Sequence, residues 1–111
     1  MFSGTQRWLT SVVGSGNGEA WAVGDKGTAL HFTGGAWTPV PPPITDMLRG
    51  VFAVAPDDIW AAGGNGRIVH YDGSTWTTFE SGTGLGLEAV WASGPHDVWV
   101  VGNDGAVLHR R

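Results

Sequence analysis

The sequence has no cysteine, and it has few charged residues. Without cysteine, neither a disulfide nor a thiolate metal site can form. Asp, Glu, Lys and Arg make up 14% of the 111 residues, against roughly 25% in an average domain. Ten acidic residues outnumber six basic ones, and the only basic cluster is the pair Arg110 and Arg111. Nucleic-acid binding needs an electropositive face, so the composition disfavours a nucleic-acid partner.

Long apolar runs are also missing. No stretch approaches the roughly 20 apolar residues that a membrane-spanning helix needs. The N-terminus lacks the charged segment and apolar run of a signal peptide. We therefore expect no membrane partner, and neither absence identifies a cellular compartment.

Glycine and tryptophan are abundant instead. Glycine accounts for 19 of 111 residues, more than twice the usual share of roughly 7%. The glycines stand beside Asn or Asp in short groups, which is typical of tight hairpin turns. Val, Ile, Trp, Tyr and Thr fill the segments between them, and these residues favour strands. With no apolar period of 3.6 residues, the pattern predicts an all-β chain.

The same residues recur every 39 positions, with no insertion. The recurring sets are Trp21, Trp60 and Trp99; His31, His70 and His109; Gly24, Gly63 and Gly102; and Leu9, Leu48 and Leu87. In the second copy, the turn residues separate four short strands, at about 50–54, 58–62, 67–71 and 75–79. The chain is thus predicted to be one module, residues 1–111, built from three copies at about 9–40, 48–79 and 87–111.

Four strands in a repeat of about 40 residues is the period of a β-propeller blade. The motif V-[FW]-A-x-x-P-x-D-[IV]-W-x-[AV]-G-x-x-G-x-[IV]-[VL]-H-Y-D-G-x-x-W resembles the Trp-rich blade repeats of bacterial β-propellers. These belong to the broad neighbourhood of the photosystem-assembly (Ycf48-like) and sialidase (BNR) propellers. The pattern departs from the sialidase Asp box, because Asp72 precedes Trp76 by four residues instead of five. The resemblance implies a propeller fold.

Three full units of 39 residues would be six residues longer than this sequence, so we expect the third copy to lack the fourth strand. Three blades cannot close a ring, since propellers have typically four to eight. We therefore expect closure by homo-oligomerisation, with a dimer of six blades favoured over a trimer of nine. A strand donated by residues 2–6 is an alternative partner for the third blade. A fragment excised or engineered from a longer array is a further interpretation.

Each copy also carries a histidine and a carboxylate at fixed positions. A ring of imidazoles from His31, His70 and His109 would bind metal or an anion. The alternative, which we favour, is that each histidine makes the same structural hydrogen bonds in its own blade. The carboxylates precede the tryptophan of the predicted second strand in each copy and are expected to cap backbone N–H groups at a turn. They are Glu19, Asp58 and Asp97.

Five of the seven tryptophans fall into two groups. Trp21, Trp60 and Trp99 share one position and are expected to pack blade against blade. Trp37 and Trp76 share a position on the outer strand and are candidates for stacking on sugar rings. The side chains that would then bind sugar hydroxyls are Asp72, Asn65 and Arg67.

No nucleophile–histidine–acid pattern and no close carboxylate pair is present, and serine never stands in a G-x-S-x-G context. We therefore expect no catalysis, no cofactor and no metal. The favoured function is a non-catalytic scaffold or binding platform that assembles with itself. The alternative is a carbohydrate-binding lectin with one site per blade, and a weaker third interpretation is a hydrolase fragment.

Overall fold

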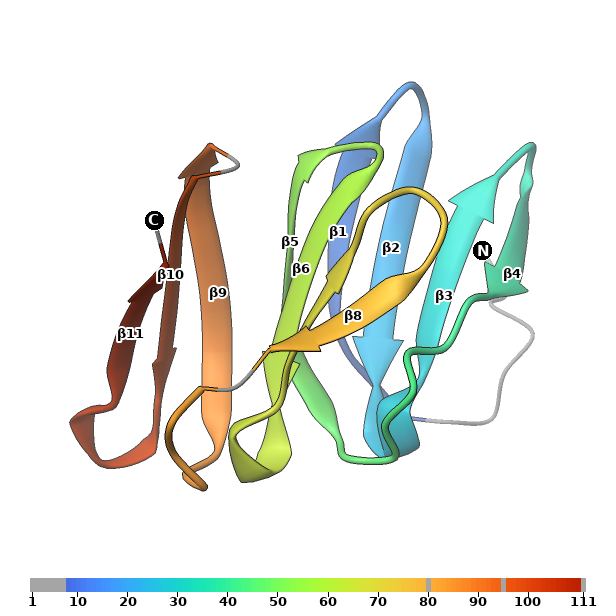
Figure 1. Cartoon of the computed structure of the whole chain (residues 1–111). Coiled ribbons are helices and arrows are strands. Elements are labelled where there is room, and N and C mark those ends of the chain that lie inside the picture. The colour runs from blue at the N-terminus through green and yellow to red at the C-terminus, as the bar shows by residue number, and fades with distance from the viewer. Residues whose placement is uncertain (1–7, 80, 95, 111) are drawn as a thin grey trace.

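The computed structural model describes residues 8–79, 81–94 and 96–110 and shows three antiparallel sheets standing side by side (Figure 1). Each sheet follows chain order, so every strand pairs with its neighbour in sequence. The strands are β1 (Leu9–Gly16), β2 (Glu19–Gly24), β3 (Ala29–Thr33), β4 (Ala36–Pro39), β5 (Leu48–Ala55), β6 (Asp58–Gly63), β7 (Ile68–Tyr71), β8 (Trp76–Phe79), β9 (Leu87–Gly94), β10 (Asp97–Gly102) and β11 (Val107–Arg110). We call the sheets β1–β4, β5–β8 and β9–β11 blade 1, blade 2 and blade 3.

The repeat therefore predicted the strands correctly. Blades 1 and 2 have four strands each, and blade 3 has three within the described residues. A strand donated by residues 2–6 lies outside the described part of the chain. None of the described helices is long and apolar enough to cross a membrane.

The second and third strands of each blade are joined by a short 3₁₀ turn that requires special backbone geometry. These turns are η1 (Asp25–Gly27), η2 (Gly64–Gly66) and η3 (Asn103–Gly105). In η2, Asn65 has a φ of 57° and Gly66 a φ of 73°, and asparagine and glycine tolerate this left-handed region best. The turn thus explains why these residue types recur.

A glycine just before each turn lets two backbone segments approach closely. A Cβ on Gly63 would collide with the backbone of Met47 and Leu48, at the start of β5. The next amide, Gly64 N–H, donates to the Met47 carbonyl at 2.8 Å. The same bond forms from the amide after Gly24 and from the amide after Gly102. It ties the second strand of each blade to the start of the first strand.

Two apolar cores lie between the blades and hold them together. Between blades 1 and 2, Trp21 and Leu48 are fully buried, and between blades 2 and 3 Leu87 takes the equivalent place. Full burial of one such side chain contributes about 1.5–3 kcal/mol. The contact between blades therefore contributes to stability, and each blade needs a neighbour on both faces to bury all its apolar residues.

Candidate interaction surfaces

A tryptophan, a histidine and a carboxylate form the same cluster in every blade. The tryptophan on the second strand stacks on the histidine of the third strand, with ring centroids 4.5, 4.3 and 3.8 Å apart in blades 1 to 3. The histidine Nε2 donates to the carboxylate, because an ionised carboxylate only accepts. The clusters are Glu19–Trp21–His31, Asp58–Trp60–His70 and Asp97–Trp99–His109.

The carboxylates thus differ from the expectation of a turn cap, since each pairs with a histidine across two strands. This pairing follows from the register, which sets Trp21 opposite His31 and Trp60 opposite His70. Each of these three histidines has a carboxylate partner within its own blade. Within residues 8–79, 81–94 and 96–110, no three His, Cys, Asp or Glu side chains gather as a metal site.

Blade 3 extends its cluster by a serine. Asp97 accepts hydrogen bonds from Ser93 Oγ, from His109 and from Trp99 Nε1, the last at 3.2 Å. The bonds from Ser93 and then His109 lower the pKa of Asp97. The carboxylate stands between the hydroxyl and the imidazole, whereas an activated serine needs the imidazole as its direct neighbour. The cluster therefore lacks the arrangement of a serine nucleophile.

Of the five residues predicted for sugar binding, Trp76, Trp37 and Asp72 lie in separate surroundings. Trp76 is half-buried at the contact with blade 1, where its indole N–H donates to the Val40 carbonyl at 2.6 Å. Trp37 is half-buried beside Phe32, with ring centroids 5.1 Å apart. Asp72 accepts two backbone N–H bonds in its own turn, and these bonds lower its pKa.

Asn65 and Arg67 meet on a residue that the sequence did not single out. Asp46 accepts from Asn65 Nδ2 at 2.6 Å and from Arg67 Nε at 2.7 Å. These two partners, Asn65 first, lower the pKa of Asp46. The group borders an open cavity of about 480 Å³, with Asp46, Arg67 and the segment 42–45 in its wall. Asp46 lies in the link between blades, outside the repeated strands, so the repeat gave no signal for it.

The two outer faces of the array expose residues whose equivalents are buried between blades. On blade 1, Val12 is 66% exposed, whereas Val51 and Val90 at the same repeat position are 8% exposed. On blade 3, Trp99 is 38% exposed, whereas Trp60 is 3% exposed. We call these faces the blade-1 flank (Trp8, Leu9 and Val12) and the blade-3 flank (Trp91, Trp99, Val101 and Val107).

One repeat position also carries polar contacts from blade to blade. Thr10 Oγ1 of blade 1 donates to the Leu48 carbonyl of blade 2. At the equivalent positions in blades 2 and 3, Arg49 forms an ion pair with Glu88, with 2.8 Å between Nη1 and Oε1. Three different residue types therefore form the polar contacts between blades at this one repeat position.

Comparison with known proteins supports the fold. No protein family and no curated protein sequence gives a significant match to the chain. The chain is similar to a solved structure of YCF48 bound to D1 peptide, with a TM-score of 0.80 and 18% sequence identity. The match covers 96% of this chain and 37% of that one, so the chain spans little more than a third of that chain's length. The three sheets are therefore blades of the β-propeller type.

Proposed function

We propose that this chain is a non-catalytic β-propeller module that assembles through its two flanks with a second copy of itself. Two copies provide six blades, within the usual range for a closed ring. The ring serves as a scaffold or binding platform. The peptide bound in the similar YCF48 structure supports a binding role for a fold of this kind.

The observation that carries the proposal is the equivalence between the exposed flanks and the chain's own buried contacts. Inside the chain, Trp60 on one blade packs in the core that includes Leu87 and Val90 of the next. The blade-3 flank presents Trp99 at the position of Trp60, and the blade-1 flank presents Val12 at the position of Val90. A head-to-tail contact between two copies would therefore repeat a packing arrangement that the chain already uses twice.

The exposure and the residue types of the two flanks give further support. Large aromatic and branched side chains gathered on one face mark interaction surfaces in soluble proteins. A head-to-tail contact generates a ring only when its rotation closes, and blade stacking around a common axis meets this condition. The order of Ser93, Asp97 and His109 supports the non-catalytic part of the proposal, because the serine hydroxyl donates to the Asp97 carboxylate instead of to the imidazole of His109.

Solution mass tests the proposal. The wild-type chain is expected at twice 11.6 kDa by sedimentation or light scattering, and Val12→Glu is expected at the monomer mass with its β-sheet circular dichroism retained. Val12 is two-thirds exposed in the single chain, so the glutamate costs the monomer little. In the ring it would be buried without a partner, which is strongly unfavourable.

The matched control is Thr38→Glu, at an exposed position on β4 away from both flanks, which is expected to leave the mass unchanged. A mass of three copies would indicate a ring of nine blades instead of six. A wild-type chain that stays monomeric and folded at high concentration would refute the proposal.

A second candidate function is carbohydrate binding, and the cavity beside Asp46 favours it. Asp46 and Arg67 present hydrogen-bonding groups at its wall, as sugar hydroxyls require. A glycan array separates the two functions, because a scaffold binds no glycan. Asp46→Ala in a chain that still folds is expected to abolish any glycan signal, and a signal that survives would place the site elsewhere.

A further inference from the structure

Two Asn-Gly dipeptides of the chain adopt nearly the same backbone angles in different surroundings. Asn17 and Gly18 form the loop between β1 and β2, and Asn65 and Gly66 lie in η2, between β6 and β7. The φ angles are 56° and 74° in the first dipeptide and 57° and 73° in the second. Any difference in reactivity between the two dipeptides therefore comes from what surrounds them.

Asn-Gly is a reactive dipeptide, because glycine has no side chain to shield its own amide. The glycine nitrogen loses its proton to solvent and attacks the side-chain amide carbon of the asparagine. A C–N bond forms, the side-chain nitrogen leaves as ammonia, and a cyclic succinimide results. Water then opens one of the two ring carbonyls and gives aspartate or isoaspartate. The net reaction exchanges an amide for a carboxylate and consumes only water, and it makes asparagine a thermolabile residue.

The surroundings of Asn17 permit each step of this reaction. Asn17 and Gly18 are both exposed at the tip of the β1–β2 hairpin. A Cβ placed on Gly18 would have no atom of the described residues within 4 Å. Solvent therefore reaches the Gly18 amide, and the backbone has room to close the ring.

The surroundings of Asn65 oppose the same steps. Asn65 Nδ2 donates to Asp46 Oδ2 at 2.6 Å, and this bond holds the side-chain amide away from the backbone nitrogen that would attack it. Gly66 is buried, so its amide is shielded from solvent. A Cβ placed on Gly66 would lie 2.0 Å from the Thr83 carbonyl oxygen. The backbone at Gly66 therefore has little room to close the ring.

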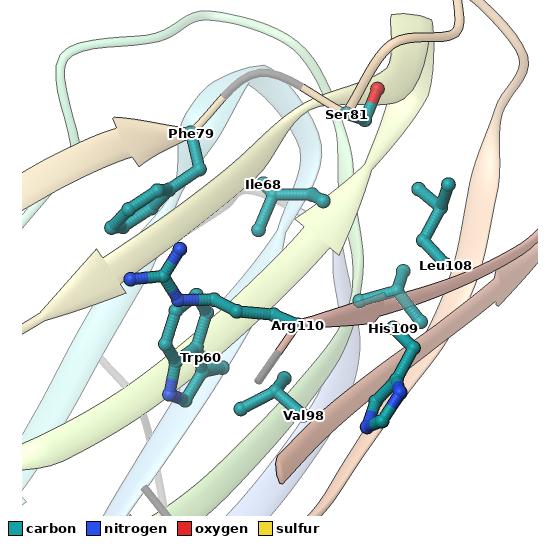
Figure 2. Close-up of a pocket in the computed structure, with 9 residues that line it drawn as sticks. Trp60, Ile68, Phe79, Ser81, Val98, Leu108, His109 and Arg110 are labelled. Carbon is teal, nitrogen blue, oxygen red and sulfur yellow. The ribbon is translucent and has the colours of Figure 1, made fainter. Parts of the chain in front are cut away.

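The segment 81–83, which covers Gly66, is itself ordered by hydrogen bonds. Ser81 Oγ donates to the Thr83 carbonyl at 3.0 Å and accepts from the Thr83 amide at 3.2 Å. Ser81 also borders the cavity between blades 2 and 3, where the Arg110 side chain lies beside the Phe79 ring (Figure 2). The contacts that protect Gly66 are therefore tertiary contacts, which an unfolded chain lacks.

We propose that Asn17 is a site of spontaneous deamidation in the folded protein, and that the fold protects the same dipeptide at residues 65 and 66. The modification places a new carboxylate two residues before Glu19, whose Oε1 accepts from His31 Nε2 at 2.6 Å. The isoaspartate product also lengthens the backbone of a two-residue loop, and loop length sets the register of a hairpin. The hairpin tip belongs to neither flank, so the inference does not rest on assembly into a ring.

Peptide mapping by mass spectrometry tests the proposal on the full chain. The folded protein is incubated at mildly alkaline pH and digested at intervals, and the aspartate and isoaspartate forms of each peptide are separated by chromatography. We expect both products at Asn17, at a rate at least about tenfold higher than at Asn65, which corresponds to about 1.4 kcal/mol of activation free energy. Synthetic peptides of residues 14–20 and 62–68 are the matched controls. They are expected to deamidate at similar rates, because neither has the contacts of the fold.

Two variants test the cause of the protection. Asp46→Ala removes the acceptor that holds the Asn65 amide and is expected to raise the rate at Asn65 while leaving the rate at Asn17 unchanged. Asp57→Ala removes the same charge from an exposed position at a different turn and is expected to change neither rate. Retained β-sheet circular dichroism shows that each variant is folded. An unchanged rate at Asn65 in folded Asp46→Ala would overturn the role given to Asp46.

The inference is refuted if the folded wild-type chain deamidates at Asn65 as fast as at Asn17. It is also refuted if Asn17 stays unmodified over a period in which its synthetic peptide is fully converted. Its failure is separable from failure of the proposed ring, because the solution mass is measured on the same sample. A monomer that deamidates selectively at Asn17 refutes the ring alone.

Discussion

Replacing Leu48 by alanine gives a quantitative test of how the blades hold together. Leu48 is 0% exposed in the core between blades 1 and 2. Truncating a buried leucine costs about 2–5 kcal/mol, because the transfer free energy is lost and a cavity remains. A loss of about 3 kcal/mol lowers the Tm of a domain of this size by about 12–24 °C. Leu87→Ala, at the equivalent buried position, is expected to give a similar loss.

Leu9 is the matched control, because it holds the same repeat position on the blade-1 flank and is 40% exposed. In the monomer, Leu9→Ala is expected to cost less than about 1 kcal/mol, since part of the side chain already contacts water. In a ring the flank is covered, so the cost should rise toward that of Leu48→Ala. Denaturant unfolding at several protein concentrations measures both values, and the mass of each sample identifies its state. Equal losses for the two variants in a proven monomer would contradict the packing described above.

Three further predictions concern single contacts. Gly63→Ala is expected to destabilise the fold by about 3 kcal/mol in denaturant unfolding, because its Cβ would overlap the backbone of Met47. Gly14→Ala, with no atom within 4 Å of the added carbon, should change stability by less than about 1 kcal/mol. Trp76→Phe removes the indole bond to Val40 and is expected to lower the free energy of unfolding by about 1 kcal/mol in the same assay. The lowered pKa of Asp46 means that its contribution is fully present above the unfolded pKa of about 3.9 and is lost as pH falls through the folded pKa. The difference in unfolding free energy between wild type and Asp46→Asn, less than about 1 kcal/mol for an exposed partner such as Arg67, should therefore shrink below about pH 4.

The repeat predicted most of the fold because the first three strands each occur in three copies and the fourth strand in two. The second copy gave strands at 58–62 and 75–79, and the structure has Asp58–Gly63 and Trp76–Phe79. The first strand of each blade is longer than predicted, since β5 begins at Leu48 instead of residue 50. Met47, the residue before Leu48, is tied to the turn of its own blade by the hydrogen bond from the Gly64 amide, and this tertiary contact has no local signature in the sequence.

Side-chain networks were harder to predict, for two different reasons. The pairing of Asp58 with His70 depends on which residues of two strands face each other, and the spacing alone does not set this register. Asp46 and Arg110 gave no signal because neither repeats. Asp46 lies in a link between blades, and Arg110 stands where the second copy has Tyr71. The partners of both residues could be identified only from the three-dimensional structure.

The position shared by Thr10, Arg49 and Glu88 bears on how such arrays are built by duplication. Arg49 faces its counterpart Glu88 in the adjoining unit, so an array made only of the second unit would set guanidinium beside guanidinium. An array of the third unit alone would set carboxylate beside carboxylate, and like charges that meet directly are unfavourable. The different residues at this one repeat position thus make an array of identical units less stable than the succession of unlike units found here. Two chains in succession would keep this alternation intact, since Glu88 of one would meet Thr10 of the next.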